Sequence, residues 1–383
     1  MRVCFISHSS SKSGAERSLL ETIDTLKMRD IECFVFLPNK GALISELGKR
    51  NIPYIIIPYK WWMGSKGLPL WMRGARIIIN IFMIIPLVIK MAKFQCDIVY
   101  TNTIVTPVGL LGAKLIGKPH IWHIREFGYE DHNLVFDMGT TFSIWFMKRL
   151  PSVYIANSYA VAKKYRQLLP DRRMEVIYQE VNTMDTGEPL PDFIRKQIND
   201  EVDIKCAIVG GLQMGKGHED AIRATGKLVS EGVKARLFII GDGDLKYKKY
   251  LYNLVAQYNI ENYVLFLGYI DNSFLVMKSI DIVLVCSRCE AFGRVTVEAM
   301  RAGKPVVGTR SGGTIELIQE GFNGFLYTPG DYEELAEKIM YLYDNPGLAK
   351  QMGEKGQKWA AEQFTEERYG EKLLAILKQL ANQ

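Results

Sequence analysis

Two glutamates stand eight positions apart in the stretch from residue 289 to residue 313, with a glycine between them. Glu290 lies in a loop after an apolar strand, and Glu298 lies inside the amphipathic segment that follows. Carboxylates accept hydrogen bonds from hydroxyl groups, and a sugar offers several hydroxyls. A glutamate pair alone is weak evidence, because glutamate is common on helices. Together with the residues between them, the pair predicts a site for a hydroxyl-rich ligand.

The residues between the two glutamates predict a phosphate-binding helix N-terminus. Phe292 and Gly293 form a strand-to-helix junction, and we expect the helix to begin near Arg294. The amides of Gly293 and Val295 then point from the helix N-terminus, where the helix dipole favours an anion. The whole stretch is therefore suited to a sugar nucleotide, with amides facing a phosphate and carboxylates holding hydroxyls.

A second phosphate-binding candidate is the loop from Gly210 to Gly217, which follows an apolar strand. It matches the pattern G-x-x-x-x-G-K-[ST] through Gly210, Gly215 and Lys216, but Gly217 replaces the hydroxyl that holds magnesium. We therefore exclude a nucleoside triphosphatase. The glycines still expose backbone amides, and Lys216 adds a positive charge. The alternative, a plain strand-to-helix turn, leaves Lys216 without a role.

Two further motifs have simpler explanations than metal or redox chemistry. Asp242 and Asp244 have the D-x-D spacing of some metal-binding sugar transferases, but they alternate with glycines, so a turn is the simpler account and we assign no metal. Cys286 and Cys289 form a C-x-x-C with no second pair to complete a zinc site. We favour coincidence over a redox motif. The scattered cysteines show no disulfide framework, which predicts a cytoplasmic location.

Short apolar runs alternate with longer amphipathic segments along the chain. This pattern predicts the α/β class, with two Rossmann-like domains, each a parallel sheet covered by helices on both faces. Ligands bind beyond the carboxyl ends of such strands, so the motifs above can share one cleft between the two domains. The expected strands are 3–7, 32–37, 54–57, 97–101, 120–124 and 153–156, then 204–209, 235–240, 263–267, 282–286, 305–308 and 324–327.

We expect the 383 residues to form three parts. Residues 1–185 form an N-terminal domain that binds the acceptor, and residues 186–365 form a second domain that binds the nucleotide sugar. Residues 366–383 form a C-terminal helix that packs back toward the first domain. We also expect residues 356–380 to be helical. Residues 178–205 show little periodicity and predict a linker.

The net charge of +6 is unevenly distributed. The first 185 residues carry 24 Lys and Arg against 15 Asp and Glu, whereas the remainder carries 24 against 27. Residues 40–118 hold 11 basic residues and only two acidic ones. A basic first half fits an anionic partner such as a phospholipid, a membrane surface or a nucleic acid. A solvated basic face is the alternative.

The most apolar segment, Ile77 to Ile89, has 13 residues, includes Asn80 and Pro86, and is shorter than the roughly 20 residues that a spanning helix needs. We therefore do not expect it to cross a membrane. Its aromatic and basic flanks suit a helix that lies at a membrane interface, and an ordinary buried helix is the alternative. These flanking residues are Trp61, Trp62, Trp71, Lys60, Lys66, Arg73, Arg76, Lys90 and Lys93.

Four motifs in the second half resemble the C-terminal domain of the retaining family 4 glycosyltransferases, which have the GT-B fold. They are G-x-x-x-x-G-K-G at 210–217, I-I-G-D-G at 239–243, V-x-F-L-G-Y at 264–269 and E-A-F-G-x-x-x-x-E-A-M-x-x-G-x-P-V-V at 290–307. The resemblance extends more weakly to both ends of the chain. There it covers S-G-A-E at 13–16, H-I-R-E at 123–126, A-N-S at 156–158 and the terminal helix.

The resemblance implies roles for the donor-binding residues. Glu290 would contact hydroxyls of the donor sugar, and Glu298 would bond the ribose of the nucleotide. The amides after Phe292 and Gly293 would contact sugar or phosphate, with Val295 among them. Lys216 corresponds to the lysine that the family places on the diphosphate.

The chain departs from the family at one charged position. Gly211 stands where the family has an arginine. Arg294 is a candidate to supply the missing charge. The departure leaves open whether activity is lower or donor preference is different.

Residues of the first half complete the expected site. Gly14 lies in the segment that resembles the family's glycine loop. His123 stands where the family often has a histidine near the donor sugar, which makes it a catalytic candidate with Glu290, although a structural histidine at a strand end is the alternative. Asn102, Arg125 and Glu126 are acceptor-binding candidates. A surface ion pair between Arg125 and Glu126 is equally compatible with the sequence.

We expect an enzyme that transfers a sugar from a nucleotide-diphosphate sugar, a UDP-sugar, with retention at the anomeric carbon and without a metal or other cofactor. The expected acceptor is a glycan or lipid-linked glycan of bacterial surface polysaccharide, and a soluble metabolite is the alternative. The enzyme would be cytoplasmic and peripheral on the anionic inner face of the membrane. A sugar-nucleotide epimerase or a non-catalytic glycan-binding protein could share this architecture. A nucleic-acid binder would explain the charge but not the glutamates, so we expect no nucleic-acid partner.

Overall fold

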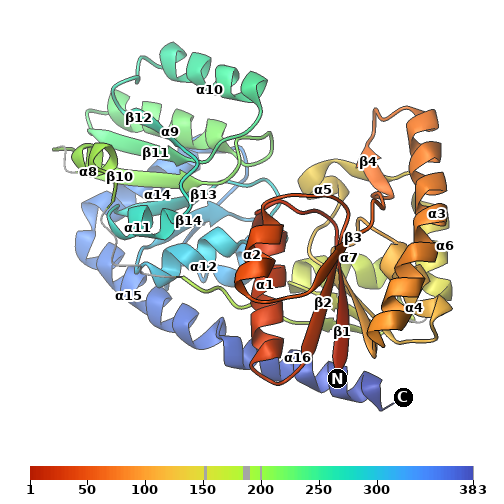
Figure 1. Cartoon of the computed structure of the whole chain (residues 1–383). Helices are drawn as coiled ribbons and strands as arrows, with labels where there is room; N and C mark the ends of the chain where they lie inside the picture. Colours follow the sequence, from red (N-terminus) through yellow and green to blue (C-terminus); the bar gives the residue numbers. More distant parts are fainter. Residues whose placement is uncertain (151–152, 184–189, 199–200, 383) are drawn as a thin grey trace. The chain divides into compact units, whose positions relative to one another are not determined.

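The computed structural model describes residues 1–150, 153–183, 190–198 and 201–382, which form two compact units (Figure 1). Unit 1 consists of Met1–Glu180 together with Thr365–Gln383, and unit 2 consists of Val181–Phe364. The expected boundary between residues 185 and 186 lies outside the described residues. Each unit is built on a parallel sheet, which confirms the α/β class.

Unit 1 has a seven-stranded sheet in which all neighbouring strands are parallel. In spatial order its strands are β3 (Tyr54–Ile56), β2 (Glu32–Leu37), β1 (Arg2–Ser7), β5 (Ile98–Asn102), β6 (His120–Ile124), β8 (Val153–Ala156) and β9 (Met174–Val176). Its helices are α1 (Gly14–Lys27), α2 (Leu43–Lys49), α3 (Leu70–Phe94), α4 (Val108–Leu115), α5 (Tyr129–His132), α6 (Thr140–Arg149), α7 (Tyr159–Leu168) and α16 (Glu366–Ala381). A separate antiparallel pair joins β4 (Met63–Ser65) to β7 (Leu134–Phe136).

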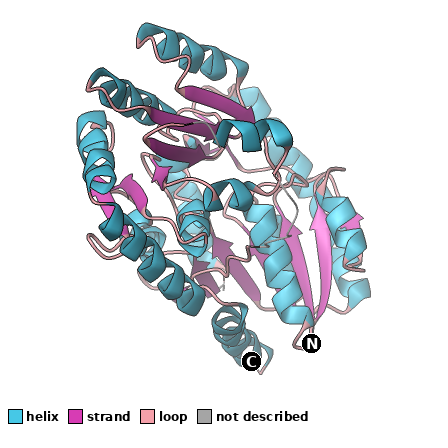
Figure 2. Ribbon diagram, turned by 90° about the vertical axis from the view of Figure 1, so that its left-hand side faces the viewer, coloured by secondary structure: helices cyan, strands magenta, loops and turns pink. Residues whose placement is uncertain are grey.

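Helices lie on both sides of the strands, which is why the unit 1 strands are apolar at successive positions (Figure 2). On one face of the sheet, Val3 and Phe5 pack in a core with residues of α1, α2 and α16. On the other face, Cys4 and Ile6 pack in a core with residues of α3 and α4. The Tyr154 hydroxyl of β8 donates to a backbone carbonyl of α6.

Unit 2 has a six-stranded parallel sheet. In spatial order its strands are β12 (Val264–Gly268), β11 (Ala235–Ile240), β10 (Ile204–Val209), β13 (Ile282–Val285), β14 (Val306–Thr309) and β15 (Gly324–Tyr327). Its helices are α8 (Asp192–Ile198), α9 (His218–Ser230), α10 (Leu245–Gln257), α11 (Ser273–Lys278), α12 (Arg294–Arg301), α13 (Thr314–Leu317), α14 (Tyr332–Asp344) and α15 (Pro346–Gln363). Because β10 and β13 are neighbours, the loops that follow them leave the same edge of the sheet.

The structure corrects two expectations about the elements. The predicted linker contains helix α8, which buries Ile194 and Ile198, and residues 184–189 and 199–200 of it lie outside the described residues. The tail expected to be helical over residues 356–380 is interrupted, because α15 ends at Gln363 and α16 begins at Glu366, the residue at which the C-terminal helix was expected to begin. The Thr365 side chain accepts a hydrogen bond from the Arg368 amide and so forms the N-cap of α16.

The apolar segment Ile77 to Ile89 is the middle of a longer helix, α3, which has 25 residues. By length and composition alone, α3 could cross a membrane. The expectation that this segment is too short to span was therefore wrong about its length. The lateral contacts of α3, which bear on how it meets a membrane, are described below.

Candidate active site

The Glu290 loop and helix α12 form one side of the candidate site. Gly293 caps α12 with a φ of 94°, a left-handed conformation that glycine adopts without strain. The side chain of Phe292 is buried and its ring packs edge-on against Phe364, with 5.7 Å between centroids. Phe292 can therefore serve a ligand only through its backbone. Glu298 lies on α12, one turn after Arg294.

The glycine pair downstream of α12 holds the Glu290 loop in place. The Gly313 amide donates to the Glu290 carbonyl at 2.6 Å. Gly312 has a φ of 52°, and a Cβ at this position would lie 2.4 Å from the Glu290 carbonyl oxygen. Only glycine lets the two backbones approach this closely. The second glycine motif of the stretch thus fixes the position of the first glutamate.

The structure brings Lys216 and Glu290 together. The Lys216 ammonium donates to Glu290 Oε2 at 2.9 Å, across the loops that follow the neighbouring strands β10 and β13. About a quarter of each side chain is exposed, 28% for Lys216 and 22% for Glu290, so both remain within reach of a ligand. The residue expected on the diphosphate and the residue expected on the sugar hydroxyls therefore share one small region of unit 2.

Backbone crowding explains the glycine that breaks the triphosphatase pattern. Gly217 has a φ of 70°, and a Cβ there would lie 2.0 Å from the Cys286 carbonyl oxygen. A serine or threonine cannot occupy this position without moving β13. The loop therefore positions Lys216 by packing its own backbone against the end of a neighbouring strand.

Arg294 and Glu298 form a second cation–carboxylate pair. Arg294 Nη2 lies 3.7 Å from Glu298 Oε1, and only 13% of each side chain is exposed. Both groups are partly desolvated, which strengthens their interaction with each other and with an incoming charge. Arg294 thus lies beside the glutamate expected at the ribose, on the same first turns of α12.

Gly211 occupies an open position. Its φ is not positive, and a Cβ there would meet only the Asp242 carbonyl oxygen, at 3.8 Å. A larger side chain therefore fits without strain. Nothing in the backbone explains why this chain lacks the arginine that the family resemblance implies here.

The D-x-D segment has the structural role that the turn interpretation predicts. Asp244 is the N-cap of α10 and accepts from the Tyr247 amide at 2.8 Å. Asp242 accepts from the Gly243 amide and lies 3.2 Å from the Lys248 ammonium. Within the described residues, no group of three or more His, Cys, Asp and Glu side chains is arranged to hold a metal ion.

His218 is a buried residue next to the Lys216 loop that the sequence analysis did not single out. It begins α9 directly after the Lys216 loop, it is fully buried, and its ring packs edge-on against Tyr247. Burial lowers the pKa of His218 to about 4, so the ring is neutral at pH 7. Lys216 therefore remains the charged group of this loop. The K-G-H sequence carries no signal that separates a buried histidine from an exposed one.

In unit 1, Arg125 and its neighbours form a buried polar cluster. Arg125 Nε donates to Asn102 Oδ1 at 2.6 Å, and Nη1 donates to Gln179 Oε1 at 2.7 Å. Nη2 is buried and has no hydrogen-bond partner within the described residues. Arg125 is 7% exposed and Glu126 is 6% exposed, so the surface ion pair considered for them is wrong. A buried guanidinium whose neighbours are amides is suited to an anionic group of a ligand.

Glu126 faces the protein rather than the ligand. Its carboxyl accepts from the backbone amides of Ile104 and Arg125, at 2.6 and 3.2 Å. Burial raises the pKa of Glu126 to about 8. Glu126 therefore orders the loop after β5. Its side chain is buried and is not exposed to an acceptor in this structure.

His123 is fully buried in β6, next to Asn102 in the sheet register. Its Nδ1 is hydrogen-bonded to the Tyr100 hydroxyl, and its Nε2 has no partner within the described residues. Burial and the nearby Arg125 charge hold the pKa of His123 well below its usual range. The ring is neutral, and its tautomer sets whether Nδ1 donates to the Tyr100 hydroxyl or accepts from it.

Gly14 is the first residue of α1, at the carboxyl-end side of β1. The loop before it is held by Glu16, which is fully buried and accepts from the Ser11 hydroxyl at 3.1 Å and the Ser13 amide at 3.2 Å. Glu16 Oε1 also lies 3.3 Å from His8 Nε2. The glutamate of the S-G-A-E segment thus shapes the loop from inside.

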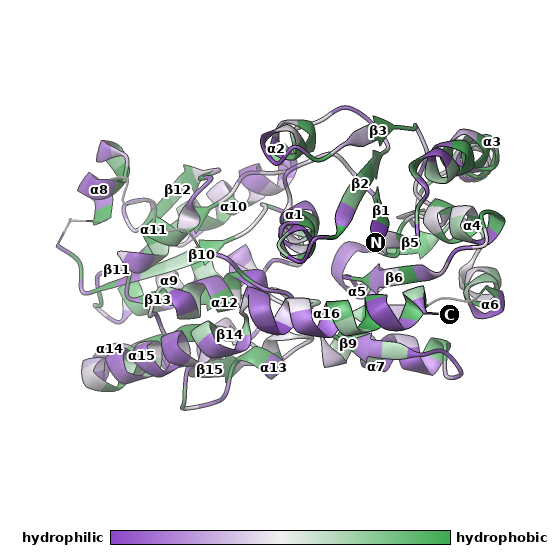
Figure 3. Cartoon of the chain, turned by 60° about the horizontal axis from the view of Figure 1, so that its bottom comes forward, coloured by the Kyte–Doolittle hydropathy of each residue, from purple (hydrophilic) through white to green (hydrophobic). Residues whose placement is uncertain are grey.

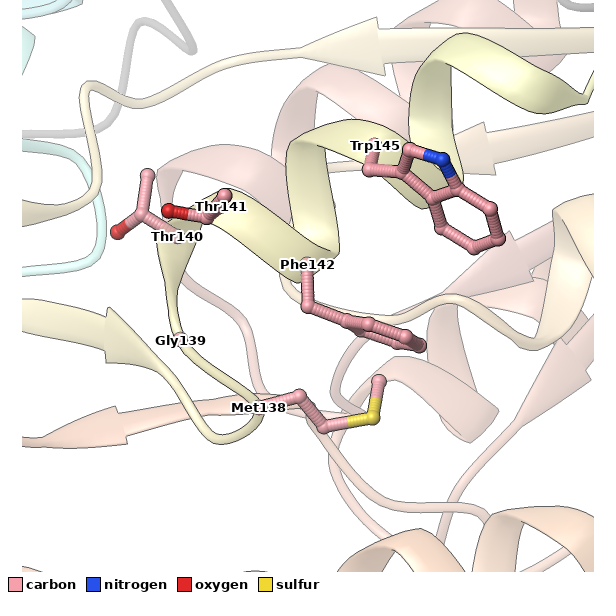
Figure 4. A pocket seen from close by; sticks show the side chains of 6 residues that line it. All are labelled: Met138, Gly139, Thr140, Thr141, Phe142 and Trp145. Atoms are coloured by element: carbon pink, nitrogen blue, oxygen red, sulfur yellow. The ribbon is translucent and has the colours of Figure 1, made fainter.

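A pocket of about 650 Å³ lies at the start of α6 (Figure 4). Its lining contains none of the predicted site residues. Phe142 and Trp145 contribute its aromatic wall, with 5.6 Å between ring centroids, and both are about half exposed. The pocket is an apolar surface feature of unit 1 and lacks the charged groups that a nucleotide needs.

Two family descriptions match this chain, one in each half. Glycosyltransferase Family 4 matches residues 12–184, and Glycosyl transferases group 1 matches residues 191–359. Together they cover most of the chain. The chain belongs to the family 4 glycosyltransferases. This result confirms the family that the sequence motifs resemble, a family of transferase enzymes.

As a family 4 glycosyltransferase, the chain is similar to several curated proteins. N-acetyl-alpha-D-glucosaminyl L-malate synthase of Bacillus anthracis is 31% identical over 218 residues, which cover 56% of each protein. The capsular polysaccharide biosynthesis glycosyltransferase CapM of Staphylococcus aureus is 26% identical over 188 residues, which cover 48% of each. The matched stretch spans about half the length of these relatives.

Solved structures of family members share the fold over the whole chain. Crystal structures of Anabaena HepE, in complex with UDP, with UDP and glucose and with UDP-glucose, are 25% identical and cover 99% of this chain and 100% of that chain. The TM-score to the complex with UDP is 0.81. The likeness confirms the GT-B fold, with two Rossmann-like domains.

Proposed function

We propose that this family 4 glycosyltransferase transfers a sugar from a UDP-sugar to a glycan or lipid-linked acceptor, with retention at the anomeric carbon. The observation that carries the proposal is the contact between Lys216 and Glu290 at the edge where β10 and β13 end. This contact supports the proposal because it joins the cation expected on the diphosphate to the carboxylate expected on the sugar hydroxyls. The UDP and UDP-glucose complexes of HepE support the choice of donor.

Unit 2 would bind the donor through charges that are already in place. Lys216, Arg294 and the N-terminal amides of α12 would stabilise the departing diphosphate, with no metal required. Glu290 would hold hydroxyls of the sugar, and Glu298 would hold the ribose. Because the Lys216 ammonium is paired with Glu290 beforehand, diphosphate binding would replace that contact and release the carboxylate for the sugar.

In the proposed reaction the bond between the anomeric carbon and the diphosphate oxygen breaks, and a bond to the acceptor oxygen forms on the same face. The acceptor proton passes to the departing diphosphate oxygen, so no protein base is needed. Glu290 orients the sugar and does not attack it. His123 would contact the donor sugar through Nε2 as a neutral ring, since burial lowers its pKa.

Unit 1 would bind an anionic acceptor through Arg125. Its guanidinium is buried, is oriented by Asn102 and Gln179, and keeps one nitrogen without a partner in the described part of the chain. A phosphate of a lipid-linked glycan matches this geometry. The similarity to CapM supports a place in bacterial surface polysaccharide assembly. We propose that this assembly step takes place at the cytoplasmic side of the membrane.

A thermal-shift screen with UDP-, GDP- and ADP-sugars tests the donor. A ligand at about 100 times its Kd stabilises the native state by about 2.7 kcal/mol, which corresponds to a rise of several degrees in Tm. We expect this rise with UDP and a UDP-sugar, and a loss of it in Lys216→Met. If none of the nucleotides raises Tm, the donor assignment is wrong. Release of an altered UDP-sugar without any acceptor would instead show an epimerase.

A further inference from the structure

Helix α3 exposes a continuous apolar face. Figure 3 shows the hydrophobic colour along much of this helix. The exposed side chains recur at helical spacing, so they lie in one stripe about 27 Å long along the helix axis. Ile81 and Phe82 are each 62% exposed. We call this stripe the α3 face; it consists of Trp71, Ile78, Ile81, Phe82, Ile85 and Ile89.

The opposite side of α3 is anchored to unit 1. Leu87 and Met91 are fully buried and lie against α4, where a Cβ at Gly112 would touch both side chains. The Asn80 side chain exchanges two hydrogen bonds with the backbone of Lys60, at 2.7 and 3.0 Å. The helix cannot turn its exposed stripe into the core without breaking these contacts. The α3 face therefore stays exposed in the folded unit.

Arg76 adds a further lateral contact that a spanning helix would lose. Its guanidinium donates to the Met63 carbonyl at 3.1 Å and lies 3.3 Å from Asp137, whose side chain is fully buried. If α3 crossed a bilayer, the Arg76 guanidinium would lose these polar partners where no water replaces them. α3 therefore has the length of a spanning helix but the contacts of a helix that lies on a surface.

The segment that carries the α3 face has basic residues and no acidic ones. No Asp or Glu occurs between residues 47 and 96. Lys66 lies before the helix, and Lys90 and Lys93 lie in its last turns, all three exposed. Helix α6 repeats the pattern on a smaller scale, because exposed Phe142 and Trp145 precede two basic residues and no acidic ones. A wide apolar stripe with basic ends complements an anionic, apolar surface.

We propose that the α3 face inserts into the surface of an anionic lipid bilayer, with α3 parallel to the membrane plane. The stripe enters the boundary between headgroups and acyl chains, and Lys66, Lys90 and Lys93 contact lipid phosphates. This inference deepens the proposed function by naming the surface where a lipid-linked acceptor would be met. It does not depend on the donor or on the transfer reaction.

The structure also corrects which tryptophans take part. Trp62 is 2% exposed, and its indole N–H donates to the Ile104 carbonyl at 2.8 Å. The Trp61 indole donates to the His8 carbonyl at 2.7 Å, and this side chain is half-buried. Both were expected to flank an interfacial helix, but both have structural tasks. Trp71, which is 72% exposed, is the tryptophan of the α3 face.

Co-flotation of the full chain with vesicles tests the proposal. One vesicle type contains phosphatidylcholine alone, and the other contains about one-third phosphatidylglycerol. We expect binding to the anionic vesicles, reduced at least about tenfold by the double variant Ile81→Glu, Phe82→Glu, because two large apolar side chains no longer leave water. Replacing Lys90 and Lys93 by Gln should reduce binding about fivefold per charge, on anionic vesicles only.

Phe193→Glu is the matched control, because Phe193 in α8 of unit 2 is 60% exposed, close to the value for Phe82. The control should bind vesicles like the wild type, and all variants should keep the wild-type Tm and the Tm rise with UDP. Failure of the wild type to float, or equal losses in Phe193→Glu, would overturn the proposal. A dimer in light scattering that Phe82→Glu dissociates, without vesicle binding, would show that a second copy covers the α3 face. If membrane binding fails but UDP still raises the Tm, only the membrane proposal is wrong. If UDP does not raise the Tm, the proposed donor is wrong.

Discussion

Glu290→Ala should separate donor binding from sugar transfer. In the unliganded chain Glu290 pairs with Lys216 at 2.9 Å, and each side chain is about one-quarter exposed. Such a partly exposed pair contributes about 0–1 kcal/mol. Removing Glu290 removes a contact that competes with the diphosphate for Lys216, so the affinity for UDP should stay the same or tighten by at most about fivefold.

Transfer should respond in the opposite direction. If the Glu290 carboxylate accepts two hydroxyl hydrogen bonds of the donor sugar, its loss costs about 1.5–3 kcal/mol for each bond. The value of kcat/KM should therefore fall by about 10² to 10⁴. Calorimetry with UDP and a coupled transfer assay measure the two effects, and Glu290→Gln, which keeps an acceptor of the same size, should lose less.

Two results would refute this reasoning about Glu290. A loss of UDP affinity beyond about tenfold would mean that the carboxylate binds the nucleotide or orders the loop around it. Transfer within about threefold of wild type would mean that Glu290 does not touch the sugar. The double variant with Lys216→Met is a further check. Its effect on UDP affinity should differ from the sum of the two single effects, because Lys216 and Glu290 are in direct contact.

Three other variants address charge and pH. Lys216→Met should weaken UDP binding by about 10- to 100-fold in calorimetry, since a charged hydrogen bond to the diphosphate is lost; unchanged affinity would place the diphosphate elsewhere. Gly211→Arg should fold normally, because a Cβ there is 3.8 Å from its nearest contact, and should tighten UDP about tenfold; a lower Tm would contradict the open geometry. His120 is buried with a pKa lowered to about 3, so the unfolded chain takes up a proton below pH 6.5 that the folded chain does not. Its contribution to the free energy of unfolding therefore falls by up to about 1.4 kcal/mol per unit as the pH drops from 6.5 toward 3. Urea unfolding at pH 7 and pH 5 should show a smaller loss in His120→Gln than in wild type, and equal losses would exclude His120 as the cause.

The strands were predictable from the sequence because both faces of each sheet are covered. The runs at Glu32–Leu37 and Ala235–Ile240 are apolar at nearly every position, and both of these strands have the expected bounds. β4, β7 and β9 have three residues each and were missed. β3 is equally short but was predicted, because it lies in the apolar run of residues 54–57.

The candidate site was predictable in its residues but not in their pairing. Glycine and charge spacing singled out Lys216, Glu290, Arg294 and Glu298. That Lys216 would meet Glu290 depends on β10 and β13 being neighbours in the sheet, although β11 and β12 lie between them in the chain. Strand order follows from long-range packing, which local periodicity does not encode.

Burial was the other property that the sequence could not supply. Arg125 and Glu126 have the composition of a surface ion pair, yet both are buried. The Arg125 guanidinium donates to side-chain amides, and the Glu126 carboxyl accepts from backbone amides. Trp62 and Trp71 are equally aromatic, yet one is buried and the other is exposed. Tertiary contacts decide these outcomes, and the residue type alone does not.

The return of the chain to unit 1 at Thr365 has a consequence for the order of folding during synthesis. The unit 1 core includes Tyr369, Leu373 and Leu377 of α16, and the Tyr369 hydroxyl bonds to Thr22 of α1 at 2.7 Å. A ribosome delivers these residues only after all of unit 2. The first unit to emerge is thus the last to be complete, and until then the side of its sheet that α16 covers is open to water and to chaperones.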